Sequence, residues 1–249
     1  MTRTLVLPRN QWIDIESGPP RPCPYLADRE IQLELGVIIP DGETFDELME
    51  GGHRRIGQVF YVPGCGGCRD CIPIRVPLAA FQPSKSQRRC WRRFSERFHV
   101  QVLPPAFDAE HFELYRRHSL HVSDENEPGD EDSYVRAFLL SQVQTHLIEY
   151  RVDDELVACS ILDEGAQCVS SVYVYWDPSR PELNAGTFSA LWEMRWAEGL
   201  GKEHYYLGYW VSQCSRMNYK NRFRPYELLD WQGARWRRFD ELEPVLPWA

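Results

Sequence analysis

The sequence lacks a long hydrophobic run. No apolar stretch approaches the roughly 18 consecutive residues that a membrane span needs, so we expect no transmembrane helix and no contact with a membrane. The N-terminal segment, residues 1–20, has an apolar patch too short for a signal peptide and lacks a small-residue cleavage site. With 249 residues, of which 43% are hydrophobic and 26% charged, the chain is typical of a globular protein. We therefore expect it to be cytoplasmic.

The chain also lacks the positive charge that is usual in nucleic-acid-binding proteins. Its net charge is −9. The charges are unevenly distributed, however: residues 51–100 carry ten Lys/Arg against two acids, whereas residues 101–170 carry four against fifteen. Because a phosphate-binding surface needs only a local positive potential, the segment 51–100 is a candidate for binding a polyanion.

Eight cysteines in a reducing compartment are not expected to form structural disulfides, so clustered ones favour a metal site. Cys65, Cys68 and Cys71 lie within seven residues, among glycines that let the backbone wrap around a bound atom. Cys23 is the natural fourth ligand from a separate loop. The spacing fits either zinc or an iron–sulfur cluster, and the alternative is a set of unpaired thiols.

A dense arginine run follows the cysteines. Ser84 or Ser86 is expected to cap a helix that runs to about Phe98, with Trp91 and Phe94 on its buried face. Six cations share the rest of this helix with the single acid Glu96: Lys85, Arg88, Arg89, Arg92, Arg93 and Arg97. Like charges at this spacing repel each other, which favours an anionic partner over a merely solvated face.

The predicted fold class is α+β, with an N-terminal cysteine-containing lobe (residues 1–100) and a C-terminal domain (residues 101–249). Pro73 and Pro77 predict that the run Ile72–Phe81 is an edge strand or an irregular one. In the C-terminal domain the patterns predict three strands, a helix and a fourth strand, in that order: 145–150, 156–163, 168–176, 186–199 and 203–210. This order resembles the N-acetyltransferase-like (GNAT-like) fold.

The usual coenzyme A signature of that fold is missing. The segment PELNAGTFSALW, residues 181–192, lacks the Gln/Arg-x-x-Gly-x-Gly turn that presents backbone N–H groups to a pyrophosphate at a helix start. A coenzyme-A-dependent acetyltransferase is therefore a poor hypothesis, and we expect no coenzyme A.

Three motifs in order resemble the aminoacyl-tRNA–protein transferases of the arginyltransferase family. They are Tyr61-x-Pro63-x-Cys65-x-x-Cys68-x-x-Cys71-x-Pro73-x-Arg75, then Phe81-x-Pro83-Ser84-x-Ser86-Gln87-Arg88-Arg89, then Tyr206-Leu207-Gly208-Tyr209-Trp210 with Cys214-x-x-Met217-x-Tyr219-Lys220-x-x-Phe223-x-Pro225. The short chain and the CxxCxxC form resemble the bacterial branch, the aspartate/glutamate leucyltransferases. The acidic segment 118–132 departs from the family pattern.

The resemblance implies transfer of an amino acid from the 3′ end of a charged tRNA to the α-amine of a protein that begins with Asp or Glu, which marks that protein for degradation in an N-degron pathway. The ester is already activated, so the chemistry requires mainly orientation, a proton acceptor and an oxyanion donor, and no cofactor. Leucine is the expected transferred group. Arginine is the alternative, because Asp177, Glu193 and Glu203 could make the aminoacyl pocket acidic. An RNA-binding module with a structural zinc site and no chemistry is the alternative from another class.

The resemblance also suggests roles for residues. The catalytic candidates are Tyr209, Tyr219 and Lys220. The candidates for the tRNA acceptor stem are Lys85, Arg88, Arg89, Arg92 and Arg93. Lys220, Arg222 and Arg224 are candidates for the tRNA end or the acidic side chain of the acceptor. Arg75 is a candidate for pairing with the acceptor's N-terminal carboxylate, because arginine binds carboxylates bidentately. The aminoacyl pocket is expected to involve Tyr206, Tyr209, Trp210, Met217 and Tyr219, although an aromatic strand can also be core.

Overall fold

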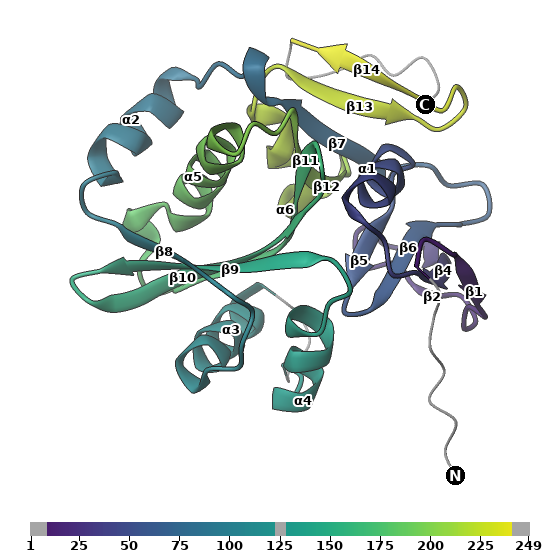
Figure 1. Cartoon of the computed structure of the whole chain (residues 1–249), viewed down its shortest axis with the longest axis horizontal. Helices are drawn as coiled ribbons and strands as arrows, with labels where there is room; N and C mark the ends of the chain where they lie inside the picture. Colours follow the sequence, from purple (N-terminus) through teal and green to yellow (C-terminus); the bar gives the residue numbers. More distant parts are fainter. Residues whose placement is uncertain (1–8, 123–127, 241–249) are drawn as a thin grey trace.

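The computed structural model of this chain describes residues 9–122 and 128–240. Within these residues it has a four-stranded sheet near the N-terminus and an eight-stranded sheet that dominates the rest of the fold (Figure 1). A third, two-stranded pairing joins β2 (Arg21–Pro22) to β3 (Glu30–Ile31). The α+β class predicted from the sequence is confirmed.

The small sheet belongs to a part of the chain, residues 9–71, that we call the cysteine lobe. Its strands, in sheet order and all antiparallel, are β1 (Ile13–Ile15), β4 (Leu33–Val37), β6 (Val59–Pro63) and β5 (Arg54–Ile56). Helix α1 (Gly42–Glu50) starts after Asp41, whose side chain accepts a hydrogen bond from the Thr44 N–H. Phe45 of α1 packs on Phe60 of β6, which holds the helix against the sheet.

The large sheet draws its strands from both halves of the chain. In sheet order they are β14 (Arg235–Phe239), β13 (Tyr226–Asp230), β7 (Ile72–Pro77), β12 (His204–Trp210), β11 (Cys168–Trp176), β10 (Glu155–Glu164), β9 (Gln144–Val152) and β8 (His99–Leu103). Strand β7 lies before residue 100 and β8 runs across it, yet both belong to this sheet, so the boundary between the two sheets does not fall at residue 100 of the chain. A division into two independent domains stays a prediction.

Strands β11 and β12 form a parallel pair in an otherwise antiparallel sheet. They are connected by η3 (Pro181–Leu183) and helix α5 (Ala185–Gly199). Their pairing covers only the first residues of each strand and ends at Ser170 and Tyr206. Beyond that point β12 contains an irregularity between Tyr206 and Gly208. The predicted order of three strands, a helix and a fourth strand is thus confirmed.

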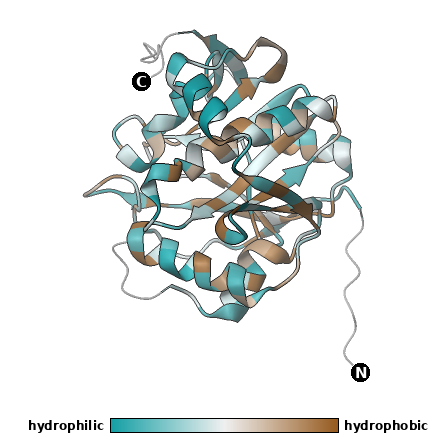
Figure 2. Ribbon diagram, turned by 90° about the vertical axis from the view of Figure 1, so that its left-hand side faces the viewer, coloured by the Kyte–Doolittle hydropathy of each residue, from teal (hydrophilic) through white to brown (hydrophobic). Residues whose placement is uncertain are grey.

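Helices cover both faces of the large sheet (Figure 1). Helices α2 (Lys85–Phe94) and α5 lie on one face; α3 (Ala109–Val122), α4 (Glu131–Tyr134) and the π-helical turn η2 (Val135–Leu139) lie on the other. Figure 2 shows hydrophobic stretches on both the strands and the helices, alternating with hydrophilic ones. Two apolar clusters, one on each face, form the core: one contains Phe94 and Phe188, the other Leu114 and Phe138.

The sequence predicts an edge strand or an irregular one for residues 72–81; the edge position is wrong, whereas the pairing of β7 with β12 is irregular between Tyr206 and Gly208. Strand β7 lies between β13 and β12, and η1 (Leu78–Ala80) follows it. The prolines are tolerated because β13 pairs only with Ile74 and Arg75, which lie between Pro73 and Pro77. The missing proline N–H groups therefore interrupt no ladder on that side.

Other expectations differ in detail. Helix α2 ends at Phe94, not Phe98, because the chain turns there: the Arg97 and Phe98 N–H groups both bond to the Phe94 carbonyl before β8 begins. Of the acidic segment 118–132, residues 123–127 lie outside the described residues. No helix among the described residues is long and apolar enough to cross a membrane.

Candidate functional site

Helix α2 is fixed by a capping box and an aromatic contact. The Ser84 hydroxyl accepts from the Gln87 N–H (3.3 Å), and the Gln87 side chain accepts from the Ser84 N–H (2.7 Å). On the buried face the Trp91 ring stacks on Phe188 of α5, with centroids 5.5 Å apart. These contacts fix which face of the helix points outward.

The outward face of α2 carries five of the predicted cations, and the sixth follows the end of the helix; all six are exposed: Lys85, Arg88, Arg89, Arg92, Arg93 and Arg97. Within the described residues none of the six forms an ion pair with a carboxylate. Since neighbouring like charges on a helix destabilise it, an uncompensated row of this length favours an external anion.

Two cavities flank α2. The first, which we call the Trp91 cavity, has a volume of about 540 Å³ and is lined by Arg88 and Arg92 of α2 together with Arg195 of α5. The second, the Tyr219 cavity, has a volume of about 380 Å³ and includes Arg89 and Arg93. Residues four apart share a helix face, so α2 presents one pair of arginines to each cavity.

The Tyr219 cavity joins α2 to the C-terminal motif. Besides Arg89 and Arg93, its walls contain Tyr219 and Arg222 of the 3-10 turn η4 (Tyr219–Arg222), and Thr187 in the first turn of α5. No Asp or Glu lines it. Two motifs that lie more than a hundred residues apart in the sequence therefore meet around one cationic cavity. Arg224 does not join them, because its guanidinium bonds to the Asp240 carbonyl instead.

A buried carboxylate lies behind this cavity. Glu193 of α5 is fully buried and accepts hydrogen bonds from the hydroxyls of Tyr150 (3.0 Å), Ser160 (2.5 Å) and Tyr205. Burial raises its pKa, although the three donors act against that shift. Tyr219 is 42% exposed, and desolvation of its buried part together with the Glu193 charge raises its pKa.

Glu193 does not provide an acidic pocket for a substrate, because its oxygens are already occupied. Asp177, a second acid considered for such a pocket, is paired with Arg117 at 2.9 Å. The third, Glu203, is exposed. None of the three lines either cavity beside α2.

Lys220, the residue after Tyr219, points to the opposite side of η4. Its Nζ is 2.8 Å from the Tyr209 carbonyl oxygen and 3.7 Å from the Met217 sulfur. Burial lowers the pKa of Lys220 to about 7, and the nearby charge of Arg54 adds to this effect. A substantial fraction of this amine is therefore unprotonated at neutral pH.

The aromatic residues of β12 do not form one pocket. The Tyr209 hydroxyl is buried and donates to the Gly52 carbonyl (3.0 Å), which joins β12 to the cysteine lobe. The Tyr206 hydroxyl bonds to Glu50 on another side of the sheet, and Trp210 Nε1 donates to the Asn218 carbonyl. Because side chains alternate along a strand, three of these positions cannot share one face. Tyr209 thus has no free hydroxyl to donate to an oxyanion.

Arg75 is not free to bind a substrate carboxylate. Its guanidinium is paired with Glu50 and Glu227, the latter at 2.7 Å. It also donates to the Tyr206 hydroxyl (2.8 Å) and lies over the Trp236 ring (4.3 Å). The sequence identified a carboxylate-binding arginine, but its carboxylates are the chain's own.

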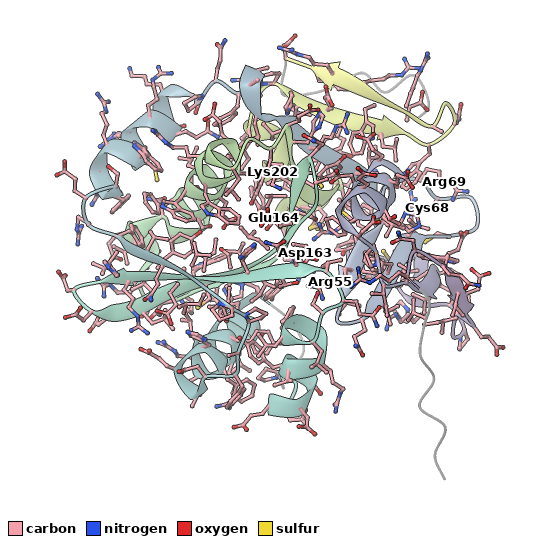
Figure 3. The ribbon with its side chains drawn as sticks, viewed as in Figure 1. Arg55, Cys68, Arg69, Asp163, Glu164 and Lys202 are labelled. Carbon is pink, nitrogen blue, oxygen red and sulfur yellow. The ribbon has the colours of Figure 1, made fainter. Side chains whose placement is uncertain are left out.

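Cys68 lies in the loop between β6 and β7 (Figure 3), whereas Cys23 and Cys71 pack against Val211 and Cys214, which follow β12. Burial raises the pKa of Cys71 to about 12, and Cys23, Cys65 and Cys68 are near enough to add to this shift. Cys68 instead accepts a hydrogen bond from Arg29 (3.1 Å), and the Cys65 sulfur lies 3.4 Å from the Gln32 N–H. Nowhere in residues 9–122 and 128–240 are three or more Cys, His, Asp or Glu side chains placed to hold one metal ion. The donor chemistry suits zinc or an iron–sulfur cluster, but the arrangement does not, so metal binding stays a prediction.

One residue that the sequence did not single out is Arg54, at the start of β5. Its Nη1 donates to Ser170 Oγ (2.9 Å), and its Nη2 donates to the carbonyls of Ser171 (2.5 Å) and Val172 (3.2 Å). It reaches from the cysteine lobe to β11, where that strand has separated from β12. In the sequence, Arg54 is marked only by its position in a pair of arginines between two glycines and a predicted strand, which is a weak indication of a functional residue.

The sequence matches two family models. Residues 21–89 match the N terminus, and residues 110–230 the C terminus, of the Arginine-tRNA-protein transferase. An Aspartate/glutamate leucyltransferase of Chromobacterium violaceum is 36% identical over 226 residues, which are 89% of this chain and 92% of that protein. Another, of Chromohalobacter salexigens, is 36% identical over 225 residues, which are 88% and 90% of the two chains.

The likeness to solved structures is weaker. L-PGS from Bacillus licheniformis has a TM-score of 0.44 and 14% identity, over 68% of this chain and 50% of that chain. The sequence comparisons, by contrast, cover nearly the whole length of both partners. The chain therefore belongs to the arginine-tRNA-protein transferase family and is an aminoacyltransferase.

Proposed function

We propose that this enzyme transfers leucine from leucyl-tRNA to the α-amine of proteins that begin with Asp or Glu. The observation that carries the proposal is the meeting of Arg89 and Arg93 with Tyr219 and Arg222 around one cavity, beside a row of unpaired cations. The names of the relatives give the transferred group and the acceptor. A cytoplasmic location stays a prediction.

In this proposal α2 binds the acceptor stem. Its exposed cations contact phosphates, and the arginines that line the Tyr219 cavity hold the 3′ end. Base-specific recognition is not needed for this task, because the stem is positioned through its backbone. The cavity has cationic but no acidic walls, which supports leucine over arginine as the transferred group, since an arginyl side chain would be repelled there.

The transfer forms one peptide bond and breaks one ester bond. The acceptor's ammonium first loses a proton; the neutral amine then attacks the ester carbonyl, and the ribose oxygen leaves with a proton, so that one proton is released overall. Lys220, with a pKa of about 7, is the proposed proton acceptor, directly or through a water molecule. Tyr219, which lines the cavity on the other side of η4, is proposed to contact the 3′ end of the tRNA and not the reacting carbonyl.

No nucleophilic side chain or cofactor takes part in this scheme, because the aminoacyl ester is already activated. Alignment of the two substrates supplies most of the acceleration. Purified protein is incubated with leucyl-tRNA and a peptide that begins with Asp. We expect the peptide to gain the mass of one leucyl residue, and the same peptide with an acetylated α-amine to gain none. Binding of tRNA without any change in the peptide would overturn the proposal.

A further inference from the structure

Arg54 is a cation without a counter-ion. In the described part of the chain it forms no ion pair, and neither does Lys220, whose pKa it lowers. Arg54 is also only partly buried, so water or a ligand can reach it. The Arg54 charge disfavours protonation of the nearby Lys220 amine, so an anion bound beside Arg54 would offset an unpaired positive charge at the junction of the lobe and the sheet.

The guanidinium is held by uncharged groups only. Three of its five N–H donors are used by Ser170 Oγ and two β11 carbonyls. Its Nε–H and one Nη1–H have no partner among the described residues. The anchoring therefore fixes the direction of the side chain without neutralising its charge, as a preformed anion site requires.

The opposite side of Arg54 is closed by Gly208 of β12. This glycine has φ +87°, and a Cβ built on it would lie 3.0 Å from the Arg54 Cζ. Only glycine suits both the backbone conformation and the close approach. The glycine of the Tyr206–Trp210 motif is thus explained by the need to seat this guanidinium beside β12.

We infer that Arg54 binds the side-chain carboxylate of the acceptor's N-terminal Asp or Glu, an inference that rests on the proposed function. Arg54 lies against Gly208, and Lys220 Nζ lies 2.8 Å from the carbonyl of the next residue, Tyr209. A terminal residue whose carboxylate is held at Arg54 therefore has its α-amine close to Lys220. A tRNA phosphate is a less suitable occupant, since the exposed arginines of α2 already provide a phosphate surface.

The test compares Arg54→Gln with wild type on two peptides that differ only in the first residue, Asp or Asn, at saturating leucyl-tRNA. The loss of a charge-assisted hydrogen bond should raise KM for the Asp peptide about tenfold to a hundredfold. The reaction of the Asn peptide and the KM for leucyl-tRNA should not change. The ratio of kcat/KM for the two peptides, measured in one preparation, does not depend on the fraction of protein that is folded.

Arg116→Gln, in an exposed residue of α3, is the matched control and should leave the ratio unchanged. If Arg54→Gln is insoluble, Arg54→Lys replaces it; an ammonium cannot keep the three anchoring hydrogen bonds of the guanidinium and present a fixed N–H to the carboxylate as well, so the ratio should still fall, by a smaller factor. An unchanged ratio, or an effect confined to the KM for leucyl-tRNA, overturns the inference. Absence of transfer by the wild-type protein would instead contradict the proposed function.

Discussion

Arg55 of β5 and Asp163 of β10 form a buried ion pair that joins the cysteine lobe to the large sheet. Arg55 Nε lies 2.6 Å from Asp163 Oδ2, and both side chains are almost completely buried (Figure 3). A second N–H of Arg55 reaches the other carboxylate oxygen at 2.8 Å, and Thr145 Oγ1 donates to that oxygen at 2.7 Å. The pair fixes β5, and with it the adjacent Arg54, against the sheet.

Replacing one partner of this pair should destabilise the protein severely. Asp163→Ala leaves the Arg55 charge buried and unpaired, which should lower the free energy of unfolding by about 3–5 kcal/mol. The exposed pair Arg180–Glu155 provides the control: Glu155→Ala should cost about 1 kcal/mol or less. Urea unfolding followed by circular dichroism measures both. Equal effects of the two substitutions would show that the buried pair does not hold the lobe.

The cations of α2 should set the salt dependence of tRNA binding. Arg89→Gln and Arg93→Gln each remove a phosphate contact, so each should weaken binding and reduce the slope of log K against log salt by about 1. Filter binding of leucyl-tRNA between low and physiological salt gives the slope. Arg116→Gln should leave it unchanged. A slope that is insensitive to both α2 substitutions would place the tRNA elsewhere.

Activity should rise with pH through the titration of Lys220. The proton acceptor must be neutral, and its pKa is about 7, so kcat should increase between pH 6 and 8 as the amine loses its proton. Lys220→Met should lower kcat about a hundredfold or more and remove this rise. Lys202→Met, which changes a lysine paired with Glu164, should keep the rise. A pH profile of Lys220→Met that matches the wild-type profile would exclude this role.

The same lysine should make stability pH-dependent. The pKa of Lys220 is lowered from 10.5 in the unfolded chain to about 7 in the fold, so between these values the unfolded chain binds more protons. The contribution of Lys220 to the free energy of unfolding should therefore fall as pH falls from about 10 to 7. Urea denaturation of wild type and Lys220→Met at several pH values measures this contribution as the difference between the two curves. A constant difference would contradict the burial of the amine.

Gly208→Ala should damage the site more than the fold. A positive φ at a non-glycine residue costs on the order of 1–3 kcal/mol, and the added methyl group must displace Arg54. Thermal unfolding gives the first effect, and the preference for an Asp over an Asn peptide gives the second. Gly199→Ala, in α5 with no atom within 4 Å of its added Cβ, should be neutral or slightly stabilising. If Gly208→Ala retains the preference for the Asp peptide, Gly208 is not needed to position Arg54.

The local features of the fold could be predicted from the sequence because they depend on neighbouring residues. The Ser84 cap, the cationic face of α2 and the strands β9 to β11 all follow from spacing and side-chain type. The interior position of β7 could not be predicted, since it depends on which strands pair with it and not on the two prolines that it contains.

In the site, too, features that depend on neighbouring residues could be predicted, and features that depend on contacts between distant residues could not. The sequence identified Lys220, Tyr219 and the α2 arginines. In the fold, Tyr219 and two of these arginines line one cavity, whereas Lys220 lies on the other side of the same short turn. It assigned a substrate carboxylate to Arg75, whose acidic partners come from α1 and β13 and lie far away in the sequence. Arg54 became recognisable only once its distance from Gly208 was known.

The most direct test of the account is a competition between leucyl-tRNA and arginyl-tRNA for one peptide that begins with Asp. Purified enzyme, equal amounts of the two charged tRNAs and mass spectrometry of the peptide are sufficient. The account predicts a product that is heavier by one leucyl residue, with little arginyl product. A product that carries arginine alone, or an unmodified peptide, would contradict it.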